Sequence, residues 1–329
     1  MLLDGRSPEA IAAAVRTLRA GDLLGLPTET VYGLAADATS DVAVARIFAA
    51  KGRPSDHPLI VHVADAAGVA HFAASVPEFA QKLIDAFWPG PLTLILPRRP
   101  DVGAAAAGGQ DSIGLRCPSH PVAQAVLRAC AAHGLHGLAA PSANQFGRVS
   151  PTTAAHVQAE FGDSLLVLDG GACEVGIEST IIDCTRGVPV LLRPGSIGRA
   201  QVEAACGLPL RAKEELVVPD PRASGTLEAH YAPTAKVRLM DARALQTALD
   251  LLGADAAHIA VYSRAILKTP SARVIRRRMP DDAAATAQQL FAVLRHFDAE
   301  GARLIWIETP PDTAEWDGVR DRLQRASAA

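Results

Sequence analysis

The chain has 329 residues, so two domains are expected, because a single hydrophobic core seldom grows beyond roughly 250 residues. Apolar residues make up 49% and charged residues 20%, which is ordinary for a globular protein with a packed core. The formal net charge of −3 excludes a chain that is strongly basic throughout, and it leaves room for a local basic cavity.

The five cysteines form no C-x-x-C pair and no zinc-finger spacing, which is typical of reduced thiols in a cytosolic protein. The first residues lack a basic region followed by a long apolar run, so no signal peptide is expected. No apolar stretch approaches the length that crosses a bilayer. The sequence therefore predicts a cytoplasmic protein without a membrane partner.

Helices and strands are expected to alternate over the first part of the chain. Ser7 and Pro8 introduce a helix over 10–20, and an Ala-rich helix over 41–50 leads into Lys51. Further helices are expected over 121–132 and 152–160. Apolar strands are expected over 23–26, 59–63, 92–96, 113–116, 137–140, 165–168, 180–183 and 190–193. This alternation predicts an α/β domain over residues 1–206.

The character of the chain changes after residue 206. Residues 207–235 hold several prolines among charged and small residues without a clear period, which predicts an extended linker or lid. Residues 236–329 then resume an α/β pattern, with a helix over 284–297 and strands over 237–240, 259–262 and 304–308. We expect a second, smaller α/β domain there.

Cations and hydroxyl groups follow several of the expected strands. Lys51 and Arg53 stand two residues apart, Arg116 ends one strand, and Ser142 follows another. Ligands of open α/β sheets gather beyond strand ends, and several such cations suit a triphosphate. Each residue alone also has an ordinary structural interpretation: His62 would be a hydrogen-bonded core residue, Glu29 a partner for an arginine, and the cations surface charges. The residues by themselves indicate an α/β protein with an anionic-ligand pocket.

A series of short strings gives a more specific indication. The series begins with Pro27-Thr28-Glu29-Thr30-Val31-Tyr32-Gly33-Leu34 and continues with Lys51-Gly52-Arg53-Pro54, Trp88-Pro89-Gly90-Pro91-Leu92-Thr93, Arg116-Cys117-Pro118, Ala140-Pro141-Ser142-Ala143-Asn144, Glu178-Ser179-Thr180-Ile181, Leu192-Arg193-Pro194-Gly195 and His230-Tyr231-Ala232-Pro233. Together they resemble the YrdC-like threonylcarbamoyl-AMP synthases in their long, two-domain form. The resemblance spans nearly the whole chain. It implies a twisted, open mixed sheet with flanking helices, and a Rossmann-like C-terminal domain.

The resemblance also implies roles for individual residues. It makes Lys51, Arg53, Ser142 and Asn144 the catalytic set around ATP. The residues that it assigns to threonine are Thr30, His62, Arg116, Ala140 and Ser179. The further ATP contacts that it implies are His57, Ser112, Ser150, Arg193 and Tyr231.

The implied reaction joins L-threonine, bicarbonate and ATP. Threonine's amine would capture the bicarbonate carbon, and the resulting carbamate would attack the α-phosphorus of ATP with loss of pyrophosphate. Such a displacement depends on charge neutralisation and alignment rather than on a covalent nucleophile. Mg²⁺ is expected to accompany ATP, with no metal site made by the protein itself. The product would pass to a tRNA-modifying transferase complex for N6-threonylcarbamoyladenosine synthesis.

Two alternatives remain open at this point. YrdC-like domains have also been regarded as double-stranded-RNA binders, so a basic concave face would bind RNA or tRNA with an affinity that falls steeply as salt rises. Carbamoyl transfer of the hydrogenase-maturation type shares the implied fold. The zinc-finger cysteines and the large multidomain context of that type are missing from this sequence.

Overall fold

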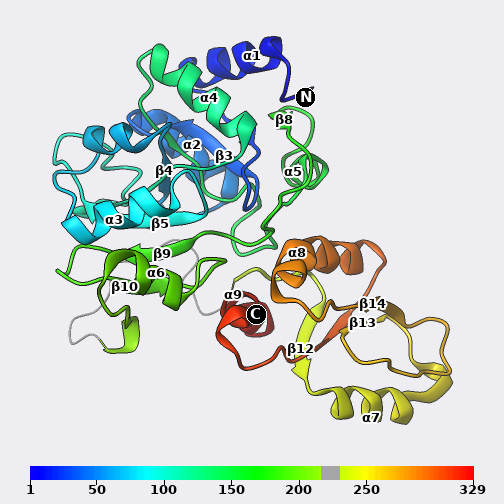
Figure 1. Cartoon of the computed structure of the whole chain (residues 1–329). Helices are drawn as coiled ribbons and strands as arrows, with labels where there is room; N and C mark the ends of the chain where they lie inside the picture. Colours follow the sequence, from blue (N-terminus) through cyan, green and yellow to red (C-terminus); the bar gives the residue numbers. More distant parts are fainter. Residues whose placement is uncertain (216–229) are drawn as a thin grey trace. The chain divides into compact units, whose positions relative to one another are not determined.

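The computed structural model describes residues 1–215 and 230–329, and the chain divides into two compact units (Figure 1). The first comprises Met1–Phe146 and Ser150–Thr226, and the second comprises Gly147–Val149 and Leu227–Ala329. Part of the expected linker, 207–235, therefore lies outside the described residues.

The first unit is built on one large mixed sheet. Its strands are β1 (Leu2–Asp4), β2 (Leu24–Leu26), β3 (Gly33–Asp37), β4 (Ile60–His62), β5 (Leu92–Pro97), β6 (Ser112–Arg116), β7 (Leu138–Ala139), β8 (Leu166–Asp169), β9 (Thr180–Asp183), β10 (Val190–Arg193) and β11 (Arg211–Ala212). Its helices are α1 (Pro8–Arg19), α2 (Asp41–Lys51), α3 (Glu78–Phe87), α4 (Pro121–Ala132), α5 (Ala154–Phe161) and α6 (Arg199–Cys206). Within the described residues the strand order is β1-β8-β2-β3-β7-β4-β6-β5-β9-β10-β11.

The helix termini follow from local chemistry. The side chain of Ser7 caps α1 by accepting the N–H of Ala10 at 3.1 Å, and Pro8 needs no partner at the first position. At the end of α2, Gly52 adopts a left-handed conformation with a φ of 61°. Because glycine has no Cβ, it reverses the chain there without strain. Lys51 and Arg53 therefore leave the backbone on either side of a fixed turn.

The two faces of this sheet differ in what covers them. Alternate residues of a strand point to opposite faces. Ile113 and Leu115 of β6 belong to the core that also contains α2, α3 and α6 side chains. Ser112, Gly114 and Arg116 consequently point to the other face, which we call the site face. On that face α1 and α4 form a second core over β2, β7 and β8 (Figure 1).

The second unit is a smaller parallel α/β sheet. Its strands are β12 (Lys236–Met240), β13 (Ile259–Ser263), β14 (Ile275–Arg278) and β15 (Leu304–Glu308), and its helices are α7 (Ala242–Leu252), α8 (Ala283–Ala299) and α9 (Asp317–Ser327). The described strands lie in the order β12-β15-β13-β14. Val261 and Trp306 pack against Leu245 and Leu249 of α7. Figure 1 shows α8 on the other side of this sheet from α7. The predicted fold class is confirmed for both units.

The cysteines are buried and free, as the sequence predicted for reduced thiols. Burial raises the pKa of Cys130 to about 12, so this thiol stays protonated at neutral pH. Among the residues that the structure describes, no helix has both the length and the apolar character needed to span a bilayer.

Candidate active site

The Lys51 side chain joins two of the predicted motifs. Its ammonium donates to the backbone oxygen of Ser142 at 2.6 Å and also to that of Asn144. The loop in turn pairs with the strand beside it, since Ala143 N donates to the oxygen of Tyr32 at 2.8 Å. The segment Lys51-Gly52-Arg53 is thus bonded directly to the segment Ser142-Ala143-Asn144, although the two are far apart in the sequence.

The Arg53 side chain contacts the segments that flank these two motifs. Its guanidinium donates to the oxygen of Pro58 at 2.9 Å and lies 5.7 Å from the centre of the Phe146 ring. The His57 ring packs edge-on against the same Phe146 ring, with centroids 5.6 Å apart. Phe146 N donates to the oxygen of Lys51 at 2.9 Å. The predicted ATP residues Arg53 and His57 therefore lie against one aromatic side chain, which the sequence reasoning had not singled out, and Lys51 binds the backbone of the same residue.

Arg116 is held in place from three directions. Its guanidinium lies 2.6 Å from a carboxylate oxygen of Glu29, donates to Thr30 Oγ1 at 2.8 Å and donates to the oxygen of Gly90 at 3.3 Å. The other carboxylate oxygen of Glu29 accepts the N–H of Ser119 at 3.1 Å. The expectation that Glu29 would partner an arginine is confirmed. A guanidinium so fixed can offer a fork of donors to a carboxylate.

His62 lies beside Arg116 on the site face, because the two are register partners on β4 and β6. Burial lowers the pKa of His62 to about 3, and the nearby charge of Arg116 adds to the lowering. The imidazole is therefore neutral at physiological pH. Ala140 follows β7 and belongs to the core on the same face, where its small side chain takes little room.

A second polar group lies farther along the sheet. Thr93 and Ser179 share a hydrogen bond of 2.7 Å between their hydroxyl oxygens. Arg193 donates to the Ser179 hydroxyl at 3.2 Å and to the Ser179 backbone oxygen at 3.0 Å. Ser150 donates its hydroxyl proton to Glu178. Thr93 and Glu178 were not predicted, although Thr93 is the one polar residue in the otherwise apolar strand 92–96, which is a usable signal.

Strand β6 connects the two ends of the predicted site. Ser112 begins the strand and Arg116 ends it, both on the site face. At about 3.3 Å per residue, the two residues stand roughly 13 Å apart. Pro58, which accepts a hydrogen bond from Arg53, precedes the strand paired with this one. An extended ligand that combines a nucleotide with an amino acid fits such a span.

Positive charge predominates among the buried groups here. Lys51, Arg53, Arg116 and Arg193 expose 2%, 8%, 4% and 3% of their surface. The buried carboxylates of the described first unit are Glu29, Glu178 and Asp183, and Asp183 is paired with Arg186 at 2.9 Å. The four cations therefore outnumber the two remaining buried acids, Glu29 and Glu178, and Glu29 already pairs with Arg116, so the excess positive charge favours an anionic ligand. Burial and the neighbouring charge of Arg53 lower the pKa of Lys51 to about 7, and Glu160 opposes this.

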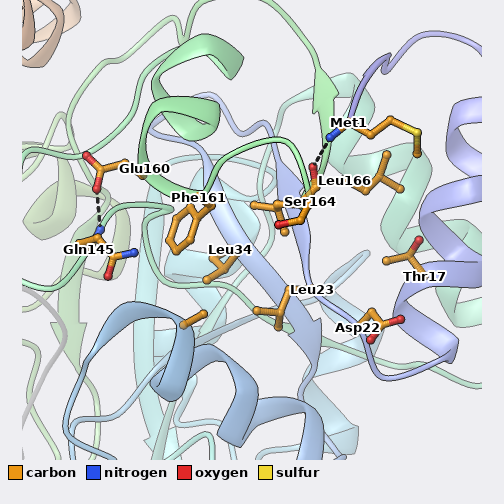
Figure 2. Close-up of a pocket in the computed structure, with 12 residues that line it drawn as sticks. Met1, Thr17, Asp22, Leu23, Leu34, Gln145, Glu160, Phe161, Ser164 and Leu166 are labelled. Atoms are coloured by element: carbon orange, nitrogen blue, oxygen red, sulfur yellow. Dashed lines mark hydrogen bonds between the residues drawn. The ribbon is translucent and has the colours of Figure 1, made fainter.

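A separate hollow of about 750 Å³ in the first unit is not this site. Figure 2 shows Leu23, Leu34 and Phe161 between the Glu160–Gln145 hydrogen bond, 2.9 Å long, and the amino group of Met1. The charged side chains that line it are the acids Asp22 and Glu160, with no lysine or arginine among the described lining residues. A triphosphate would be repelled there. None of the predicted site residues lines this hollow.

Tyr231 lies in the second unit. Its ring stacks on Phe291 at 5.4 Å between centroids, and the Arg322 guanidinium lies 5.4 Å above the ring. Tyr231 is fully buried and has a φ of 60°. Its predicted contact with ATP stays a prediction.

The fold and the buried cations define a class: an α/β protein that holds a small anionic ligand on one face of a twisted mixed sheet. Comparison with known proteins narrows this class. The family model described as "Telomere recombination" matches residues 16–195, and the model described as "Threonylcarbamoyl-AMP synthase, C-terminal domain" matches residues 197–328.

Individual relatives match over almost the whole chain. The threonylcarbamoyl-AMP synthase of Bacillus subtilis is 36% identical over 96% of this chain and 92% of its own length, and that of Pyrococcus abyssi is 36% identical over 96% and 94%. The crystal structure of P. abyssi Sua5 complexed with L-threonine superposes with a TM-score of 0.89 at 34% identity, covering 99% of this chain and 97% of that one. The chain therefore belongs to the two-domain, YrdC-like threonylcarbamoyl-AMP synthase family, as the sequence predicted.

Proposed function

We propose that the chain is an L-threonylcarbamoyladenylate synthase, a nucleotidyltransferase that forms threonylcarbamoyl-AMP and pyrophosphate from L-threonine, bicarbonate and ATP. The observation that carries the proposal is the set of four buried cations on and around the site face, which outnumber the buried carboxylates Glu29 and Glu178 there. The names of the relatives and the threonine complex of one of them support the choice of substrates.

Threonine would bind at the Arg116 end of the site. The Arg116 guanidinium, fixed by Glu29 and Thr30, would pair with the threonine carboxylate. His62 is neutral, so it would contact the amino acid without repelling its ammonium group. Ser179 would offer its hydroxyl, and Ala140 would leave space for the side chain.

ATP would bind at the Lys51 end of the site. Two of the three N–H donors of Lys51 hold the loop over 142–144, and the third would remain for a phosphate oxygen. Arg53, Ser142 and Asn144 would complete the phosphate shell, and Ser112, Ser150, His57, Arg193 and Tyr231 would make further nucleotide contacts.

The chemistry would be an in-line displacement. An oxygen of the threonine carbamate would form a bond to the α-phosphorus, and the bond from that phosphorus to the pyrophosphate oxygen would break. The fixed cations would offset the charge that accumulates on the leaving oxygen. Mg²⁺ would arrive with ATP as part of the substrate.

The product would go to a tRNA-modifying transferase complex, because an acyl adenylate of this kind hydrolyses in water. The RNA-binding alternative suits the site face poorly. Its cations are at least nine-tenths buried, and a polyanion cannot reach them as a small ligand can.

Pyrophosphate release and product analysis test the proposal directly. With ATP, threonine and bicarbonate present, threonylcarbamoyl-AMP should form, and omission of any one substrate should stop it. Lys51→Ala and Arg53→Ala should each abolish release. Lys82→Ala, which removes a half-exposed lysine of α3, should not affect it. Full turnover by both site variants, or product formation without bicarbonate, would overturn the proposal.

A further inference from the structure

A strip of positive charge lies along one edge of the second unit. Residues 256–280 contain six lysines and arginines and no aspartate or glutamate, in a chain whose net charge is −3. Three of the six, Arg276, Arg277 and Arg278, are consecutive and exposed in β14, which is an edge strand of its sheet (Figure 1). We call these three residues the arginine edge. Nothing in the synthase chemistry uses them.

Little of this charge is neutralised by neighbouring groups. Arg278 pairs with Asp281 at 3.0 Å, and both side chains are exposed. Arg276 donates to the oxygen of Leu267 at 3.3 Å, and Arg277 lies 2.9 Å from Nε2 of His296, a group that is itself able to carry positive charge. Within the ranges that the structure describes, Arg276 and Arg277 have no carboxylate partner.

The buried acid at the end of β15, two strands from the arginine edge, already has partners. Glu308 lies at the end of β15, where one oxygen accepts the hydroxyl of Ser263 at 2.6 Å and the other lies 2.5 Å from the guanidinium of Arg264. Its charge therefore belongs to that pair and not to the arginine edge. Arg276 and Arg277 therefore present charge to solvent without a carboxylate partner among the described residues, and Arg278 shares its charge with Asp281.

A hollow of about 490 Å³ lies beside the arginine edge. Val261 and Arg276 are cross-strand partners, as are Ser263 and Arg278, so all four point to one face of the sheet. Val261, Leu267 and Val274 give the hollow an apolar lining, and Ile266 in the same lining is 87% exposed. The volume lies within the usual range for small-ligand sites. Apolar surface and guanidinium groups thus adjoin one another.

Charged edge strands have an ordinary purpose, since they deter pairing with another chain. That purpose does not account for a hollow with an apolar lining and an exposed isoleucine. We propose that the arginine edge binds the phosphodiester backbone of an RNA strand, with a base seated in the adjoining hollow.

The chemistry favours RNA over other polyanions. Guanidinium groups match phosphate oxygens with paired donors and also stack on bases, which apolar side chains do too. An acidic peptide would use the arginines and leave the hollow empty. A lipid surface would need more than the single exposed apolar side chain that lines the hollow. A member of a tRNA-processing family also has an RNA within reach of its product.

Fluorescence anisotropy with a labelled, unmodified tRNA transcript and the full-length chain tests this proposal. The variant R276Q/R278Q should weaken binding by about tenfold at low salt, and the slope of log affinity against log salt should lose about 0.7 per lost contact. The matched control is K236Q/R238Q on β12, at the opposite edge of the same sheet. Arg238 pairs with Trp306, Trp306 with Val261, and Val261 with Arg276, so Arg238 and Arg276 lie on the same face of the sheet. The control therefore removes an equal charge from that face. It should leave binding within about twofold.

A second variant keeps the test valid if the first one folds poorly. Ile266→Glu changes an exposed residue, so it should not disturb the core, and it should weaken tRNA binding by placing a carboxylate at the hollow. Pyrophosphate release should be unchanged in all three variants, so failure here is separate from failure of the proposed function. Absent tRNA binding by the wild-type chain, equal loss in the control, or tighter binding of poly-glutamate or anionic vesicles than of tRNA would each overturn the proposal.

Discussion

Replacing Glu29 with glutamine should destabilise the first unit while keeping the shape of the threonine site. The Glu29–Arg116 pair is 2.6 Å long, and its side chains are 4% and 5% exposed. Glutamine has the same size and can still accept from Ser119 through its one oxygen, so the substitution removes the negative charge and the acceptor that faces Arg116. Loss of one partner of a buried pair costs about 3–5 kcal/mol. Because Arg116 keeps its hydrogen bonds to Thr30 and Gly90, we expect the lower end, about 3 kcal/mol.

Thermal unfolding followed by circular dichroism measures this change. For a unit of this size, 3 kcal/mol corresponds to a Tm lower by about 6–12 °C. Threonine would supply a new carboxylate to Arg116, so saturating threonine should raise the Tm of the variant more than that of the wild type. The control Glu78→Gln changes an exposed glutamate that also pairs with a cation, Lys82, and should leave the Tm unchanged. A variant as stable as the wild type, or an equal response to threonine, would refute the reasoning.

Four further outcomes are expected. The value of kcat/KM for ATP should fall as pH rises through about 7, because the ammonium form of Lys51, which we propose binds a phosphate, exists below its pKa; a profile measured from about pH 6 to 9 checks this. Between pH 6.5 and about 3, His62 is protonated in the unfolded chain but neutral in the folded one, so the free energy of unfolding decreases as the pH is lowered. The variant His62→Gln should make this decrease smaller in urea titrations. Thr93→Val removes the hydrogen bond to Ser179 and should cost about 1 kcal/mol in urea titrations and raise the KM for threonine. Chelation of Mg²⁺ should stop turnover while leaving the Tm of the ligand-free chain unchanged, because we propose that the ion enters with ATP.

The sequence supplies candidates for the site residues but not their arrangement. Lys51, Arg116 and Ser142 stand at the ends of elements whose apolar runs are plain, so their candidacy could be inferred locally. Which strands lie side by side could not be inferred, because β4, β6, β5 and β9 are neighbours in an order that the chain does not follow. The pairing of Thr93 with Ser179 depends on that order, since β5 and β9 run in parallel.

Four strands were missed, the short β1 and β11 and the longer β3 and β14, and the last two were missed for opposite reasons. β3 reads Gly-Leu-Ala-Ala-Asp and contains no β-branched residue, yet it is almost wholly buried, so tertiary packing overrides its weak local preference. β14 ends in three arginines, which hide any alternation of apolar and polar residues. An edge strand tolerates such a run because one of its sides faces solvent. The segment with the weakest strand signal thus carries the charge on which the RNA proposal rests.

The Lys51 side chain has a consequence for how ligand binding and local order are connected. It binds the Ser142 loop, which lies 91 residues away in the sequence. Burial and the charge of Arg53 lower the pKa of Lys51 to about 7, so a substantial fraction of this lysine is neutral in the ligand-free chain near neutral pH. A neutral amine donates more weakly to two carbonyl oxygens than an ammonium group does. A bound phosphate would supply the missing negative charge and raise the pKa again. The phosphate that we propose binds here should therefore also strengthen the hydrogen bonds from Lys51 to the backbone oxygens of Ser142 and Asn144.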